Sequence, residues 1–164
     1  MRKIAILDGY IDEPTCLGVP PYISPYPRYI AGAVKLYDKK NIVNYLTIDQ
    51  VRKYPENISF LAQNDLVIVI AGMSVPGRYL SGYPASPNEL KKILEGLPVK
   101  KVLTGPAAKH GFGMQGGKKT RDTDFLKEIF HLIIPGDAET VIHNYLEQNL
   151  RTYDINTEEK KKKA

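Results

Sequence analysis

Short apolar runs alternate along the chain with stretches in which apolar residues recur at helical spacing. Five runs predict buried strands, at residues 3–7, 41–46, 66–71, 99–103 and 131–134. The run at residues 66–71 is apolar at every position and rich in β-branched side chains. Such a strand is typical of the centre of a sheet that is covered on both faces.

The stretches between the runs predict helices, because apolar residues fall at positions i, i+3, i+4 and i+7. Ile30, Ala33, Val34 and Tyr37 make one such face, and Pro27 stands just before it, where a proline suits a helix start. A Thr or Asp cap is expected to open the helix at residues 47–54. The other helices are expected at residues 56–63, 87–95 and 124–129, with a last one that carries Val141, Ile142, Tyr145 and Leu146.

This alternation predicts the fold class. Parallel strands need crossover connections, and helices supply them here. We expect a three-layer, flavodoxin-like (Rossmann-like) α/β fold, doubly wound, with a five-stranded parallel sheet in the order 2-1-3-4-5. Residues 1–151 are predicted to form one domain, and residues 152–164 a charged, disordered tail.

In this topology the loops after strands one, three, four and five lie at one edge of the sheet, where ligands bind in open α/β folds. These loops cover residues 8–28, 72–86, 105–121 and 136–137. Long loops are often functional, and glycines let the backbone approach a ligand closely. We therefore expect a binding site at this edge.

Single side chains in these loops leave alternatives open. Asp8 either hydrogen-bonds a ligand or caps its own loop. Arg78 either clamps an anion or forms a surface ion pair. His110, beside Lys109 in the glycine-rich loop, is a ligand, an acid–base group or merely solvated. No dinucleotide fingerprint, Walker motif or nucleophile–histidine–acid set is found, so no catalytic residue is assigned.

Composition excludes several classes of protein. Cys16 is the single cysteine among 164 residues, which rules out an internal disulfide and a cysteine-ligated iron–sulfur cluster in this chain. The net charge of +5 is too mild to indicate nucleic-acid binding. No segment approaches a membrane span or a signal peptide. We expect a cytoplasmic protein, because the chain lacks a disulfide framework.

Four loop peptides, taken together, resemble the N-terminal, cobalamin-binding-like domain of archaeal radical S-adenosylmethionine (Fe–S oxidoreductase) proteins. These peptides are residues 8–14, 20–29, 71–79 and 105–113. The resemblance extends to about Arg151 and implies the same flavodoxin-like fold, with cobalamin as the ligand. The family's radical domain carries a Cys-x-x-x-Cys-x-x-Cys motif that this chain lacks, so radical chemistry is not carried over.

The family pattern is kept only in part. In cobalamin domains with an Asp-x-His-x-x-Gly motif the histidine ligates cobalt, and here Tyr10 stands at that position. A neutral tyrosine is a poor cobalt ligand, although some radical cobalamin enzymes are similar in lacking the histidine. The family's Ser-x-Leu is represented by Ser74 alone, and its Gly-Gly by Gly105 followed by Pro106.

We expect a non-catalytic, cobalamin-binding-like domain that binds a small ligand, or a partner radical S-adenosylmethionine domain on another polypeptide. The expected cofactor-binding residues are Asp8, Gly9, Tyr10, Ser74, Arg78, Gly105 and Gly113. One alternative is a small phosphate- or nucleotide-binding enzyme that uses Asp8, Arg78, Lys109 and His110. Another is a scaffold for protein association, because tyrosine, frequent in the first loop, is enriched at interfaces.

Overall fold

The computed structural model describes residues 1–11, 25–72, 82–112 and 124–150. Ser74, Arg78 and Gly113 lie outside the described residues, as does the expected tail at residues 152–164.

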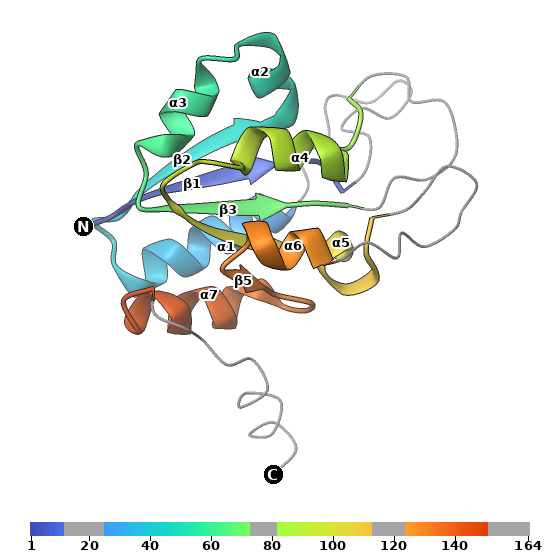
Figure 1. Ribbon diagram of the computed structural model, residues 1–164. Coiled ribbons are helices and arrows are strands. Elements are labelled where there is room, and N and C mark those ends of the chain that lie inside the picture. Colours follow the sequence, from blue (N-terminus) through green and yellow to red (C-terminus); the bar gives the residue numbers. More distant parts are fainter. Residues whose placement is uncertain (12–24, 73–81, 113–123, 151–164) are drawn as a thin grey trace, which may run out of the picture.

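Five parallel strands form one sheet in the order β2-β1-β3-β4-β5, as the alternation predicts. The strands are β1 (Lys3–Asp8), β2 (Ile42–Thr47), β3 (Leu66–Ile70), β4 (Lys100–Thr104) and β5 (Leu132–Ile133). Asp8 lies beside Thr47 of β2 on one side and Ile70 of β3 on the other. The carboxyl ends of the strands therefore meet at one edge of the sheet (Figure 1).

The helices of the described residues are α1 (Pro25–Tyr37), α2 (Ile48–Lys53), α3 (Asn57–Ala62), α4 (Pro87–Leu94), α5 (Pro106–His110), α6 (Asp124–Ile129) and α7 (Ala138–Glu147). Two of them differ from the expectation. Helix α1 begins at Pro25, so Pro27 lies in its first turn, where the missing N–H of proline has no helical partner to lose. Helix α5 occupies the start of a segment expected to be a loop, and the positive φ of Gly105 and Gly111 marks its two ends.

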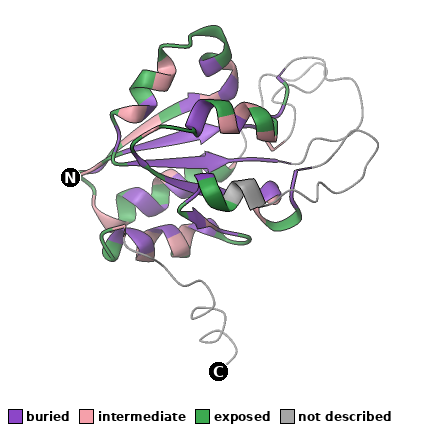
Figure 2. Cartoon of the chain, in the orientation of Figure 1, coloured by how far each residue is buried: buried purple, intermediate pink, exposed green. Residues whose placement is uncertain are grey.

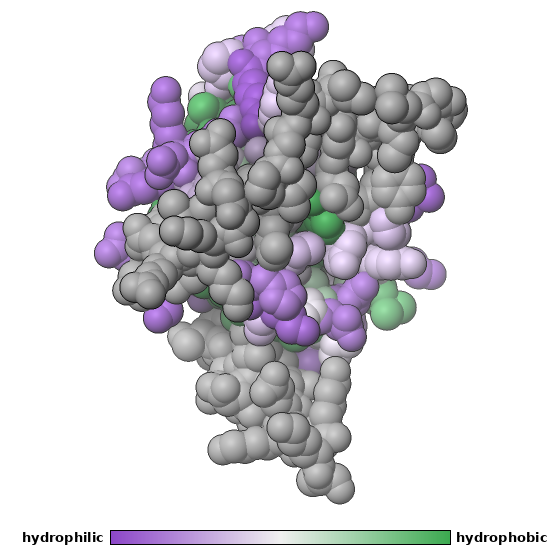
Figure 3. Space-filling view, turned by 90° about the vertical axis from the view of Figure 1, so that its right-hand side faces the viewer, coloured by the Kyte–Doolittle hydropathy of each residue, from purple (hydrophilic) through white to green (hydrophobic). Residues whose placement is uncertain are grey.

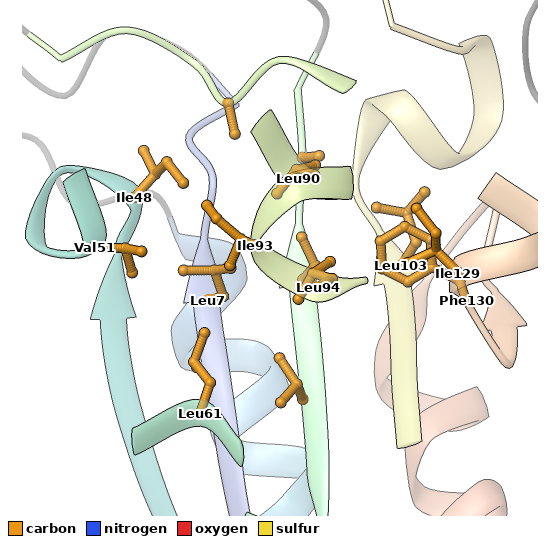
Figure 4. Close-up of a cluster of buried hydrophobic side chains, with 14 of the residues drawn as sticks. Leu7, Ile48, Val51, Leu61, Leu90, Ile93, Leu94, Leu103, Ile129 and Phe130 are labelled. Carbon is orange, nitrogen blue, oxygen red and sulfur yellow. The ribbon is translucent and has the colours of Figure 1, made fainter. Parts of the chain in front are cut away.

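The sheet is sandwiched between two layers of helices, and β1, β3 and β4 are almost wholly buried, whereas the edge strand β2 is partly exposed (Figure 2). Helices α1 and α7 cover one face, where Ile30, Val34 and Ile142 pack on Ile6 and Ile68. The opposite face carries α2, α3, α4 and α6. Figure 4 shows this second core, in which Leu90, Ile93 and Leu94 of α4 face Leu7 of the sheet.

Two capping boxes fix the starts of helices on the second face. The Thr47 side chain accepts from the Gln50 N–H, and Gln50 Oε1 accepts from the Thr47 N–H. Ser86 and Glu89 repeat this arrangement at the start of α4. Each box satisfies N–H groups that lack a helical partner, which sets the first residue of the helix. Thr47 is thereby confirmed as a cap of α2.

Candidate functional site

Two glycines flank the end of β3 at the carboxyl edge. The Gly9 N–H donates to the Ile70 carbonyl over 2.8 Å, and the Gly9 carbonyl accepts from the Ala85 N–H over 2.7 Å. On the other side of β3, a Cβ on Gly105 would lie 2.6 Å from the Ala71 carbonyl oxygen. Neither position accepts a larger side chain without a shift of the backbone. Both glycines therefore allow tight packing at the strand ends.

Asp8 ends β1 as a buried carboxylate. Its Oδ1 accepts from the Tyr10 N–H over 3.0 Å, and its Oδ2 accepts from the Tyr45 hydroxyl over 2.7 Å. The first of these bonds is the loop cap that was one of the two alternatives for this residue. Burial raises the pKa of Asp8, and the bonds from Tyr45 and Tyr10 oppose that rise.

Tyr10 lies just past Asp8 with a positive φ of 62°, a backbone conformation that is uncommon for residues other than glycine. Its ring is buried in the core under α2, and its hydroxyl donates to Asp49 Oδ2 over 3.1 Å. Burial raises the pKa of Tyr10, which keeps the phenol neutral. The side chain is therefore held inside the protein by a neighbouring carboxylate.

A charged network borders this group. The Arg52 guanidinium donates two hydrogen bonds to the Glu89 carboxylate, with Nε–Oε1 at 2.7 Å and Nη2–Oε2 at 2.9 Å. It also donates to Asp49 and to the Tyr83 carbonyl, each over 2.7 or 2.8 Å. These bonds join α2 to α4 and to the segment that passes Gly9. The hydrogen bonds to Glu89 raise the pKa of Arg52. Burial opposes this rise but is the smaller effect.

A cleft of about 220 Å³ opens farther along the same edge, between α1, α5 and the start of α7. Tyr26 and Ile30 of α1 form one wall. The other residues around it come from the loops after β4 and β5, and they are Gly105, Pro106, Lys109, His110, Pro135, Gly136, Asp137, Ala138 and Glu139. Figure 3 views the molecule from this edge, where the coloured surface is mainly hydrophilic.

Basic and acidic side chains both line the cleft. Lys109 and His110 lie in the last turn of α5, and Glu139 in the first turn of α7. Asp137 stands at the N-cap of α7, but its side chain makes no capping hydrogen bond. Gly136 has open space where a Cβ would be. The cleft thus offers N–H donors and carboxylate acceptors beside an apolar wall.

The structure divides the expected site residues into two groups. Asp8, Gly9 and Tyr10 lie together at the end of β1, where they are occupied by bonds and packing within the protein. Gly105 lines the cleft, together with Lys109 and His110 of the alternative hypothesis.

Sequence reasoning missed the partners of Asp8 and Tyr10. Tyr45 and Asp49 lie in a strand and a helix rather than a loop, and Arg52 acts across two helices. Tyr26 and Ile30 were also missed as walls of the cleft. Only the parallel register of β1 and β2, which follows from the fold, could have pointed to Tyr45.

No group of three or more His, Cys, Asp and Glu side chains in the described ranges could hold a metal ion. Among those same residues, no helix has the length and apolar character needed to cross a membrane.

Comparison with known proteins yields two archaeal relatives. The chain is 43% identical to an uncharacterized protein of Methanocaldococcus jannaschii over 156 residues, which are 94% of this chain and 28% of that protein. It is 51% identical to an uncharacterized protein of Archaeoglobus fulgidus over 104 residues, which are 63% of this chain and 19% of that protein. The chain thus spans less than a third of these relatives. No protein family and no solved structure matches it.

Proposed function

We propose that the chain is a cobalamin-binding-like domain that holds one arm of a ligand in the cleft at the carboxyl edge and performs no catalysis by itself. The cleft itself carries this proposal. It lies where ligands bind in open α/β sheets, and three separate loops or helices contribute to it. The chain matches under a third of each relative, which supports a role as one module that works together with others.

The size and chemistry of the cleft suit part of a large ligand. Pockets for drug-sized molecules measure about 300–1,000 Å³, and this cleft, at about 220 Å³, is smaller. Cobalamin carries carboxamide arms and a phosphodiester. Lys109 and His110 would donate hydrogen bonds to such oxygens, and Asp137 and Glu139 would accept from amides. The ring of Tyr26 would pack against an apolar part of the arm.

A ligand held this way receives no cobalt ligand from Tyr10. The Tyr10 hydroxyl donates to Asp49, and the side chain is 8% exposed. Burial also keeps the phenol neutral. When bound, cobalamin supplies cobalt-centred chemistry. The residues of this chain would only hold and orient the arm, and a radical S-adenosylmethionine domain on another polypeptide would be the partner.

Equilibrium dialysis against hydroxocobalamin tests the proposal. We expect saturable binding that Gly136→Val weakens by about tenfold, a loss of about 1.4 kcal/mol. The matched control is Gly32→Val in α1. A Cβ at Gly32 also meets no atom within 4 Å, but this residue does not line the cleft. No retention of hydroxocobalamin would reject cobalamin as the ligand, and equal loss in both variants would reject the cleft as its binding site.

A second candidate is phosphate or nucleotide binding in the same cleft. The N-terminus of α7 and the two basic residues of α5 favour an anion there. Asp8 does not line the cleft, so it would take no part in binding. Competition between inorganic phosphate and hydroxocobalamin separates the ligands. Tight phosphate binding with no cobalamin binding would favour this second function.

The partner hypothesis has its own test. A neighbouring reading frame that encodes a Cys-x-x-x-Cys-x-x-Cys protein would support a split enzyme, and co-purification of the two chains would measure the association. Tyr26 and Tyr29 are 41% and 57% exposed on α1, which offers aromatic contact area to a partner. If the two chains do not associate, this partner is wrong, whereas the ligand proposal stands.

A further inference from the structure

The amino edge of the sheet, opposite the cleft, carries a second recess. It measures about 440 Å³ and lies at the starts of β3, β4 and β5. Its lining is more polar than apolar and comprises Asn64, Asp65, Leu97, Pro98, Val99, Lys100, Lys101 and His131. The recess therefore gathers two lysines and a histidine beside a single carboxylate.

Lys101 is the most unusual of these residues, because it is 7% exposed at the start of β4. Its ammonium donates to the Leu97 carbonyl over 2.7 Å. Among the described residues no carboxylate lies within ion-pair distance of it. Buried charges are ordinarily paired, and an ammonium has three N–H donors. Within the described ranges the Lys101 ammonium thus has one acceptor and no counterion, and burial lowers its pKa.

His131 is held beside Lys101 by a reciprocal pair of bonds. The Lys101 N–H donates to Nδ1 of His131 over 3.2 Å, and the His131 N–H donates to the Lys101 carbonyl over 2.9 Å. Because Nδ1 accepts, the neutral imidazole carries its proton on Nε2. Burial, together with the charges of Lys100 and Lys101, lowers the pKa of His131. The ring therefore presents an N–H donor in a positively charged setting.

The carboxylate of the recess, Asp65, has a structural role. Asp65 Oδ2 accepts from the Lys3 N–H over 2.7 Å, which ties the starts of β3 and β1 together. Asn64 is likewise satisfied, since its amide donates to the carbonyls of Phe60 and Leu61 and its oxygen accepts from Asn44. Asp65 keeps its negative charge, but among the described residues it forms no ion pair with Lys100, Lys101 or His131, and two lysines outnumber it.

We propose that this recess binds an oxyanion, held by Lys101, Lys100 and His131. The chemical class is a phosphate group, either free or as the phosphomonoester of a small metabolite. A phosphate oxygen would complete the hydrogen bonding of the Lys101 ammonium and accept from Nε2 of His131. Lys100 is exposed beside them and adds a second charge. This site is separate from the cleft and does not depend on the proposed function.

Titration of the full chain with inorganic phosphate and with glycerol 3-phosphate, at constant ionic strength, tests the site. The reporter is the ring resonance of His131, followed by NMR, and His110 reports separately on the cleft. We expect saturable shifts at His131 and a higher pKa for its imidazole in the complex, because the bound dianion favours the imidazolium. Response to both ligands indicates a phosphate site, whereas response to glycerol 3-phosphate alone indicates a metabolite site.

Substitutions distinguish a specific phosphate site from non-specific attraction of phosphate to positive charge. Lys101→Met and Lys100→Gln should each weaken binding, Lys101→Met by about tenfold or more, because a charge-assisted hydrogen bond is lost. Lys39→Gln is the control, an exposed lysine of the turn before β2 outside the recess. The exposed Lys100→Gln variant keeps the test valid if Lys101→Met is unstable. Equal weakening by all three, or a response confined to His110, would overturn the proposal.

Discussion

The hydroxyl of Tyr45 on β2 donates to Oδ2 of Asp8 at the end of β1, across 2.7 Å. The other carboxylate oxygen of Asp8 caps the backbone of Tyr10. One buried carboxylate therefore joins the edge strand β2 to the turn that follows β1. Asp8 is only 3% exposed, so it has almost no contact with water. The two hydrogen bonds take the place of hydrogen bonds to water.

Tyr45→Phe removes one of these bonds and leaves the ring in place. We expect the free energy of unfolding to fall by about 1 kcal/mol at neutral pH, because a buried carboxylate loses a donor. Urea unfolding measures the change. Tyr54→Phe is the matched control, since Tyr54 is similarly exposed and its hydroxyl makes no hydrogen bond among those of the described residues. Equal effects of the two substitutions would contradict a role for the Asp8 contact.

Asp8 also gives stability a distinct pH dependence. Its pKa is higher in the folded protein than the ordinary 3.8, because burial disfavours the charged form. Between 3.8 and that higher pKa the folded state binds more protons than the unfolded state, so stability contributed by Asp8 falls as pH rises through this window. Asp8→Asn removes the titration. We therefore expect Asp8→Asn to gain stability relative to the wild type as pH rises above 3.8.

Asp38 provides a control of opposite sign for this experiment. Its pKa is lowered, chiefly by the hydrogen bond from the Lys40 N–H. The stability from Asp38 is present above the ordinary pKa of 3.8 and is lost as pH falls through the lower folded pKa. Asp38→Asn should lose stability relative to the wild type as pH rises. The two variants should therefore diverge in urea titrations between pH 3 and 7 (roughly the carboxylate range), and parallel curves would refute the assignment for Asp8.

The contact between Arg52 and Glu89 should depend on the shape of the guanidinium. Arg52→Lys keeps the charge but cannot make both bonds to the Glu89 carboxylate. Both side chains are about a quarter exposed, so solvent weakens the pair, and we expect a loss of about 1 kcal/mol in thermal or urea unfolding. A double-mutant cycle with Glu89→Gln isolates the pair. A coupling energy near zero would show that the carbonyl contacts of Arg52 carry its effect.

The strands and their order could be predicted because their apolar residues and connections obey strong rules. The run at residues 66–71 can only be stable when covered on both faces, and β3 is indeed central. Helix α5 was missed because glycines before and after it suggest a loop, whereas Gly105 and Gly111 are its two ends. Short elements of this kind depend on tertiary contacts, here the bond from the Ala107 N–H to the Ala71 carbonyl.

The site was harder to predict than the fold. Loop position correctly placed Gly105 at the carboxyl edge, but it could not separate residues that line a cleft from residues that hold the edge together. Asp8 belongs to the second kind through its bonds to Tyr45 and Tyr10. Such pairings depend on the register of strands far apart in sequence, which apolar periodicity does not determine.

Gly9 and Gly32 make the clearest test of packing at the carboxyl edge. A Cβ at Gly9 would lie 2.9 Å from the Ile70 carbonyl oxygen and 3.0 Å from the Ala85 Cβ, neither of which can move without its backbone. Gly9→Ala must therefore displace β3 or the segment before α4, and we expect a loss of about 1–3 kcal/mol in unfolding free energy.

Gly32 lies inside α1, and a Cβ there meets no atom within 4 Å. Gly32→Ala should instead stabilise the protein by about 0.5–1 kcal/mol, because alanine loses less backbone entropy in a helix than glycine does. Urea unfolding of both variants measures the opposite signs. If Gly9→Ala were as stable as the wild type, the carboxyl edge could shift to admit a methyl group. The close contacts of Gly9 would then not be needed to hold the end of β1 against β3.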